Sequence, residues 1–242
     1  MGELEDLIKQ GDISYEKEKF IDSIRAYTKA LEIGGDSHVM ADLHYKLSRS
    51  YHDMDRRRSD ESLLHGKKAL EMHRSLNDRE SVIGDLMNLA YIMQDSNNIK
   101  SAEEYIKESM KEAGDDMIMQ NEIKLTLADI LSSSKKRMNE ALALYRDISE
   151  ASEKSEDYEI FFTAEYGIIS IMKDRGEIED AYKLSKEMID KIDSICSKIK
   201  NKKERKEFRK SVSFMYDIAS DLAMDMERVT EAIEIAERMN RD

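Results

Sequence analysis

The spacing of apolar residues predicts helices along nearly the whole chain. The clearest pattern covers residues 11–33, where two amphipathic stretches flank a polar turn near Glu18 and Lys19. In the second stretch, apolar and small residues recur every three or four positions, which places them on one helical face; they are Phe20, Ser23, Ile24, Tyr27, Ala30 and Leu31. The small residues on either side of Tyr27 allow a second helix to approach closely. This segment is therefore predicted to be a helical hairpin.

The hairpin pattern recurs, and a small residue near the start of each second helix marks its register. These residues are Ser23, Ser62, Ala102, Ala141, Ala181 and Ala232. The first four steps are 39, 40, 39 and 40 residues, and the last is 51. A single hairpin leaves one apolar face uncovered, so such units are stable when they stack. We predict one all-α domain over residues 1–242 with about six antiparallel hairpins, and a long basic helical connection near residues 190–212.

Composition agrees with a thin stack of helices. Hydrophobic residues form 40% of the chain and charged residues 38%, while proline is absent and glycine numbers 9. Few positions therefore interrupt a helix. A plain helical bundle or a long antiparallel coiled coil would have similar composition. The alternation of small and large residues at a fixed register favours a solenoid over both, although another all-α scaffold of paired helices would share this periodicity.

The first hairpin resembles the signature of the tetratricopeptide repeat (TPR) family, through Gly11, Tyr15, Phe20, Tyr27, Ala30 and Leu31. Leu89-Ala90 with Ala102, and Gly176 with Ala181, match it more weakly. The period is similar to that of the longer TPR variant. Two departures are the missing proline after each second helix and Gly66, where the family prefers an aromatic residue. The resemblance implies a right-handed superhelical solenoid whose first helices line a concave groove.

That implied groove supplies the candidate binding residues. They are Ile8, Tyr15, Tyr45, Arg49, His52, Met87, Tyr91, Gln94, Leu125 and Tyr166. Tyrosine and methionine offer large contact areas to a peptide or an amphipathic helix. We therefore expect a protein-interaction scaffold or adaptor that binds another protein; the alternative is that some of these side chains pack against the next hairpin. Nearby acidic residues would favour a basic partner.

Many TPR proteins bind the C-terminal carboxylate of chaperones through lysine and asparagine. This chain has Asp12, Arg49, Tyr91 and Asp129 where that asparagine is expected. Binding of chaperone tails is therefore disfavoured.

The distribution of charge suggests an alternative to the protein-binding groove. The net charge of −13 disfavours nucleic acid and anionic membranes as partners. However, residues 198–210 hold eight basic and two acidic residues, which could contact nucleic acid or an acidic partner. The other interpretation is a solvated helical extension. A second basic run, residues 56–58, is too short to support a function. A third hypothesis, self-assembly, is disfavoured by a polar outer face on the last hairpin, with Glu231, Glu234, Glu237 and Arg238.

Residues with catalytic or metal-binding chemistry form no recognisable motif. The chain lacks a glycine-rich phosphate loop, a Gly-x-Ser-x-Gly motif and a metal-ligand spacing, so we expect neither an enzyme nor a cofactor or metal site. Cys196 lies on an apolar stripe, typical of a buried thiol. The five histidines cluster at residues 38–73; we expect them on the surface, with His44 nearest His73 and His52 nearest His65 across the hairpin. A response to pH through them is a secondary hypothesis.

Location is the last expectation. The acidic N-terminal residues lack the features of a signal peptide, no stretch is apolar enough to span a bilayer, and a single cysteine suits a reducing compartment. A cytoplasmic protein of unknown oligomeric state is the resulting prediction.

Overall fold

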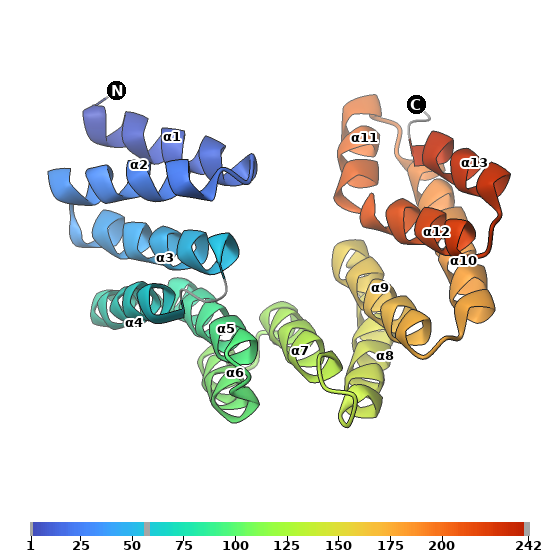
Figure 1. Cartoon of the computed structure of the whole chain (residues 1–242), viewed down its shortest axis with the longest axis horizontal. Coiled ribbons are helices and arrows are strands. Elements are labelled where there is room, and N and C mark those ends of the chain that lie inside the picture. The colour runs from blue at the N-terminus through green and yellow to red at the C-terminus, as the bar shows by residue number, and fades with distance from the viewer. Residues whose placement is uncertain (1, 56–58, 240–242) are drawn as a thin grey trace. The chain divides into compact units, whose positions relative to one another are not determined.

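The computed structural model describes residues 2–55 and 59–239, and within these ranges every regular element is a helix (Figure 1). The all-α prediction is confirmed. The basic run at residues 56–58 lies outside the described residues. The helices are α1 (Glu3–Glu16), α2 (Phe20–Ile33), α3 (Ser37–Met54), α4 (Ser59–Leu76), α5 (Arg79–Asp95), α6 (Ile99–Ala113), α7 (Met117–Ser132), α8 (Met138–Lys154), α9 (Tyr158–Asp174), α10 (Ile178–Lys198), α11 (Lys202–Ser211), α12 (Phe214–Asp225) and α13 (Val229–Met239).

Successive helix pairs correspond to the predicted hairpins. The six pairs are α1–α2, α3–α4, α5–α6, α7–α8, α9–α10 and α12–α13, with α11 inserted before the last. The predicted turn near Glu18 and Lys19 is present, with Glu18 in the left-handed region (φ 57°). Asn97 (φ 57°) and Gly176 (φ 79°) have the same conformation in the turns after α5 and α9. The insertion of α11 explains why the last step of the repeat is longer than the others.

The chain divides into two compact units, an N-terminal unit of residues 1–126 and a C-terminal unit of residues 127–242. In the N-terminal unit each helix from α1 to α6 contacts the next one, so its three hairpins stack in chain order (Figure 1). In the C-terminal unit α9 contacts both α8 and α10, and α12 contacts α9, α10 and α13. Within each unit these helices pack on their neighbours in space, as stacking of the repeats requires.

The small residues that mark the repeat are buried at helix contacts. Five of the six have no exposed surface and Ala232 is 3% exposed. In the second hairpin, the hydroxyl of Ser48 donates to the carbonyl of Ser62 (2.8 Å), and Ser62 donates back to the carbonyl of Ser48 (3.1 Å). Gly66 follows one turn later, where an added Cβ would lie 2.8 Å from the Ser48 hydroxyl. Close backbone approach at Gly66 explains why no aromatic residue stands there.

Glycine and tyrosine form matched contacts in both units. A Cβ at Gly11 would lie 2.3 Å from the ring of Tyr27, and a Cβ at Gly167 would lie 2.4 Å from the ring of Tyr145. Tyr27 is 2% exposed and Tyr145 3% exposed. Their hydroxyls donate to Asp12 and Asp129, respectively. Each ring therefore occupies the space that a side chain on the facing helix would need.

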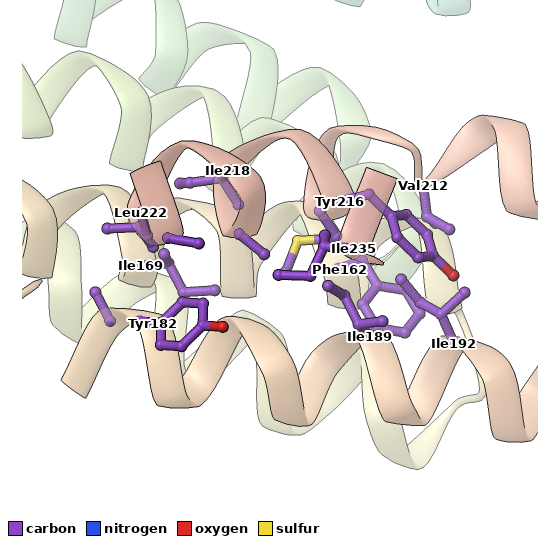
Figure 2. Close-up of a cluster of buried hydrophobic side chains, with 14 of the residues drawn as sticks. Phe162, Ile169, Tyr182, Ile189, Ile192, Val212, Tyr216, Ile218, Leu222 and Ile235 are labelled. Atoms are coloured by element: carbon purple, nitrogen blue, oxygen red, sulfur yellow. The ribbon is translucent and has the colours of Figure 1, made fainter. Parts of the chain in front are cut away.

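The core of the C-terminal unit includes buried side chains from both ends of the basic connection, such as Ile192 and Val212 (Figure 2). Phe162, Ile189, Val212, Tyr216 and Leu222 are among its buried side chains. The connection is not one continuous helix: α10 ends at Lys198, and α11 begins after the side chain of Asn201 caps it by accepting from the backbone N–H groups of residues 203 and 204.

The outer face of the last hairpin differs from the predicted polar cap. Arg238 bonds to Asp190 and Asp193 of α10 (2.7 and 2.6 Å), and Glu231 accepts from the hydroxyl of Tyr182 (2.6 Å). These charges therefore serve the packing of α13 on α10. Val229 and Ile233 are instead 51% and 55% exposed. Glu234 and Glu237 are exposed beside them, so the outer face is polar in part, and the expectation against self-assembly stays a prediction.

A pair of alanine substitutions tests the glycine–tyrosine contact. Gly11→Ala should destabilise the protein by about 1–3 kcal/mol, because the buried Tyr27 ring must move. Gly84→Ala should stabilise it by about 0.5–1 kcal/mol, because Gly84 is helical and an added Cβ meets no atom within 4 Å. Urea denaturation of both variants measures the difference. Equal effects would show that the Tyr27 ring does not require Gly11.

Candidate partner-binding site

Three adjoining hollows run across the first helices of the N-terminal unit. The first, of about 280 Å³, lies between α1 and α3; the second, of about 450 Å³, lies between α3 and α5; the third, of about 400 Å³, extends to α7. Tyr45 lines all three, Arg49 lines the first two, and Gly84 and Met87 line the last two. Because they share these walls, we treat them together as the trough.

The trough brings together six of the ten residues expected in the groove. They are Tyr15, Tyr45, Arg49, His52, Met87 and Tyr91. Arg49 is exposed and the other five are partly buried. Their side chains therefore reach the surface while their bases pack against the helices, as the walls of a binding site require.

The other four expected residues lie elsewhere. Ile8 packs against the core around Tyr27 and Leu43. Leu125 is only 9% exposed. Gln94 is partly buried and lines none of the three hollows. Tyr166 belongs to the C-terminal unit, where its ring contacts Phe214 edge to face, with centroids 5.4 Å apart. Ile8 and Leu125 therefore follow the alternative interpretation, in which these side chains pack inside the protein.

Arg49 is held between two aromatic rings of the trough. Its guanidinium carbon lies 5.0 Å from the ring centroid of Tyr15 and 5.8 Å from that of Tyr45. Tyr15 in turn donates its hydroxyl to Asp53. Burial, followed by this hydrogen bond, raises the pKa of Tyr15 to about 12, so its hydroxyl keeps its proton at neutral pH. Cation–π contacts of this kind fix the orientation of the guanidinium.

Two further carboxylates brace the walls. Asp12 accepts from the hydroxyl of Tyr27 (2.7 Å) and from the ammonium of Lys46 (2.6 Å). His52 Nε2 lies 2.7 Å from a carboxylate oxygen of Asp95. Since these side chains are already bonded, they lose little freedom on binding, which favours affinity.

The floor of the third hollow contains a buried ionisable pair that the sequence analysis missed. His73 Nδ1 lies 2.6 Å from Asp85 Oδ2, and the two residues are 2% and 0% exposed. Burial raises the pKa of Asp85 to about 6, while His73 opposes that shift. The sequence did contain a signal, because Asp85 interrupts the apolar run of α5 between Ile83 and Leu86.

Comparison with known proteins finds solved structures of similar fold. No protein-family model and no curated protein matches the chain. Among solved structures, a Rap protein complexed with competence and sporulation factor shares 13% identity over 98% of this chain and 74% of that one, with a TM-score of 0.65. The Rap conjugation gene regulator of plasmid pLS20, in complex with the Phr* peptide, shares 19% identity over 97% and 74% of the two chains, with a TM-score of 0.63.

A third similar structure is itself described as having TPR-like repeats. A Podosopora anserina putative kinesin light chain with nearly identical TPR-like repeats shares 13% identity over 76% of this chain and 93% of that one, with a TM-score of 0.56. The chain has a TPR-like fold. The resemblance seen in the first hairpin therefore extends to the architecture, although the sequences are far apart.

The histidines of the second hairpin differ from expectation in both their exposure and their pairing. His44 and His73 are buried, at 3% and 2% exposed. His44 Nδ1 lies 2.7 Å from His65 Nδ1, and the ring of Tyr51 stacks on His65 with centroids 5.7 Å apart. The expected pairing of His44 with His73 is wrong, because it assumes a turn centred about one helical turn further along the chain. The contacts of Ser48 with Ser62 set the actual register.

The basic segment contributes to packing as well as to the surface. Arg209 donates to Asp193 (2.6 Å) and to the hydroxyl of Tyr216 (2.8 Å), and Arg205 donates to the carbonyl of residue 199 (3.2 Å). Both arginines are partly buried. The exposed basic residues are Lys198, Lys200, Lys202, Lys203, Lys206 and Lys210. Lysine therefore carries the positive charge of the fully exposed residues, and it lacks the planar fork with which arginine binds phosphate in two places.

Two features are absent from the described residues. Among the described helices, none has both the length and the apolar character needed to cross a membrane. No group of three or more histidine, cysteine or acidic side chains in those residues could hold a metal ion.

The buried histidine contact predicts acid sensitivity. Burial, then Lys68 and His65, lowers the pKa of His44 to about 4. Since this is below its value of about 6.5 in the unfolded chain, the unfolded state binds the proton first. Stability present above pH 6.5 is thus lost as pH falls towards 4, by roughly 2–4 kcal/mol. Denaturant midpoints from pH 7 to 4 should fall more steeply for wild type than for His44→Leu.

His38→Gln is the matched control, because the His38 side chain is 59% exposed. It should follow the wild-type curve. Asp85 titrates in the same range but is present in all three proteins, so its contribution cancels in the comparison. Parallel curves for wild type and His44→Leu would contradict the assignment to His44.

Proposed function

We propose that the trough binds a segment of a partner protein, as a peptide or an amphipathic helix, and that the chain is a scaffold or adaptor. The observation that carries this proposal is the convergence at Tyr45 of three hollows lined by α1, α3 and α5. The helices present successive side chains at the spacing of the repeat. An elongated ligand can therefore contact several helices at once.

The chemistry of the walls suits a peptide. Tyr45, Tyr91 and Met87 offer apolar contact area. The two tyrosines have few rotatable bonds to fix on binding, and Met87 is flexible enough to adapt to a ligand. Tyrosine is among the residues that contribute most binding energy at protein interfaces. Arg49 and His52 add polar groups beside them, which can bond to a peptide backbone. The Rap regulator of similar fold was solved with the Phr* peptide, which supports the expectation of a ligand groove. The choice of residues rests on this chain alone.

The reactive groups of the chain favour binding over catalysis. Both ring nitrogens of His73 face carboxylates, with Asp85 at 2.6 Å and Asp42 at 3.4 Å. Cys196 is 1% exposed, and burial raises the pKa of its thiol, so it is a poor nucleophile. We therefore assign the protein no enzymatic role.

Selection from a random peptide library tests the proposal. Peptides selected on the wild-type chain are titrated against Gly84→Leu, whose new side chain enters the trough from a position where a Cβ meets no neighbour. The same peptides are titrated against Tyr45→Ala/Met87→Ala. Each variant should weaken binding about tenfold or more in fluorescence anisotropy, which corresponds to about 1.4 kcal/mol.

Leu64→Ala is the control, because Leu64 is 66% exposed and lies on α4, outside the trough. It should leave affinity within about twofold, the scale of a surface contact that contributes little. Peptides that bind Gly84→Leu as tightly as wild type, or a selection that returns none dependent on the trough, would reject the proposal.

A further inference from the structure

The third hollow of the trough is strongly acidic. Its lining includes the carboxylates of Asp42, Glu80, Asp85 and Glu122 and, among the described residues, no lysine or arginine. His73 is the only one of these described lining residues that can carry positive charge. The lining itself thus contains four carboxylates and at most one imidazolium. The potential inside this hollow favours a cation.

Asp85 supplies a second and independent observation. This residue has no exposed surface, and only its Oδ2 atom is engaged, by His73 at 2.6 Å. Its other oxygen, Oδ1, is buried and accepts no hydrogen bond from the described residues. A buried carboxylate oxygen without a donor is unfavourable. A donor arriving from the hollow would satisfy it.

The walls above this floor are apolar. Tyr45, Ile83, Met87 and Met119 line the hollow, and Gly84 leaves open space between them. Asp42 stands at the rim with its side chain 59% exposed, 3.4 Å from His73 Nε2. An aliphatic stem that ends in a cation matches this order of surfaces, since the stem meets the apolar walls and the cation meets the carboxylates.

We infer that the third hollow receives a lysine or arginine side chain of the bound peptide, with Asp85 Oδ1 accepting from its terminal N–H and Asp42 contributing at the rim. This inference rests on the proposed function, because it names the residue type that the trough selects in its partner. The rest of the trough, around Arg49, lacks this excess of carboxylates among its described residues, so the third hollow sets the position of the basic residue.

The test uses a small probe that does not depend on a peptide. Nα-acetyl-lysine N-methylamide is titrated into the full chain, and the amide of Gly84 and the methyl groups of Met87 and Met119 are followed by NMR. These signals should shift and saturate. The norleucine analogue keeps the stem and removes the charge. It should bind at least about tenfold more weakly, as expected for loss of a close charge pair.

Two protein variants complete the cycle. Asp85→Asn keeps the shape of the floor and should weaken the lysine probe about tenfold. Asp42→Asn changes an exposed rim residue and should weaken it without any effect on folding. Asp22→Asn, on α2 and outside the trough, is the matched control. Equal shifts by the lysine and norleucine probes, or full affinity in both Asp85→Asn and Asp42→Asn, would overturn the inference.

Other outcomes separate this inference from the proposed function. A shift of Gly84 by calcium chloride but not by the lysine probe would identify a divalent cation as the occupant and overturn it. Saturable binding of the lysine probe without any trough-dependent peptide would reject peptide binding and leave a cation pocket. Trough-dependent peptides that bind equally well with norleucine in place of each lysine or arginine would leave peptide binding and reject the pocket.

Discussion

Close contact between neighbouring helices at small residues is the constraint on which the rest of the structure depends. Ser23, Ser62, Ala102, Ala141 and Ala181 have no exposed surface, because each lies where two helices approach. Gly11 and Gly167 leave room for the rings of Tyr27 and Tyr145. Since these contacts set the register of the helices, they also decide which residues of each first helix lie side by side on the surface.

The trough follows from that register. Tyr15, Tyr45 and Tyr91 stand on three different first helices, yet they line adjoining hollows. Their polar ends and neighbours are engaged within the protein: Tyr15 bonds to Asp53, Lys46 bonds to Asp12, and His52 bonds to Asp95. A surface held in place by such bonds is suited to binding, because little freedom remains to be lost.

Buried polar groups in the second and third hairpins have two different roles. The hydroxyls of Ser48 and Ser62 each donate to the backbone carbonyl of the other residue, and the side chain of Asn88 donates to the Ser48 hydroxyl (2.8 Å). These bonds set the hairpin register. The His73–Asp85 pair leaves Asp85 Oδ1 without a donor among the described residues. His44 Nε2 and His73 Nε2 are likewise buried without a hydrogen bond from the described residues, so the unpaired atoms lie at the histidines and at Asp85 and not at the serine contacts.

The sequence by itself determined the helical content, the repeat and the turns, because these depend on local spacing of apolar, small and turn residues. It also predicted a groove whose residues include Tyr15, Tyr45, Arg49, His52, Met87 and Tyr91, and the structure places these six in the trough. The TPR resemblance implied that first helices line the groove, and the helical period gave the face. Only the tertiary structure decided that Ile8 and Leu125 pack inward, that His44 meets His65, and that α11 is a separate helix from α10. It alone revealed Asp85 beside His73, because that pairing depends on how α4 and α5 meet, and residue spacing within either helix does not contain this information.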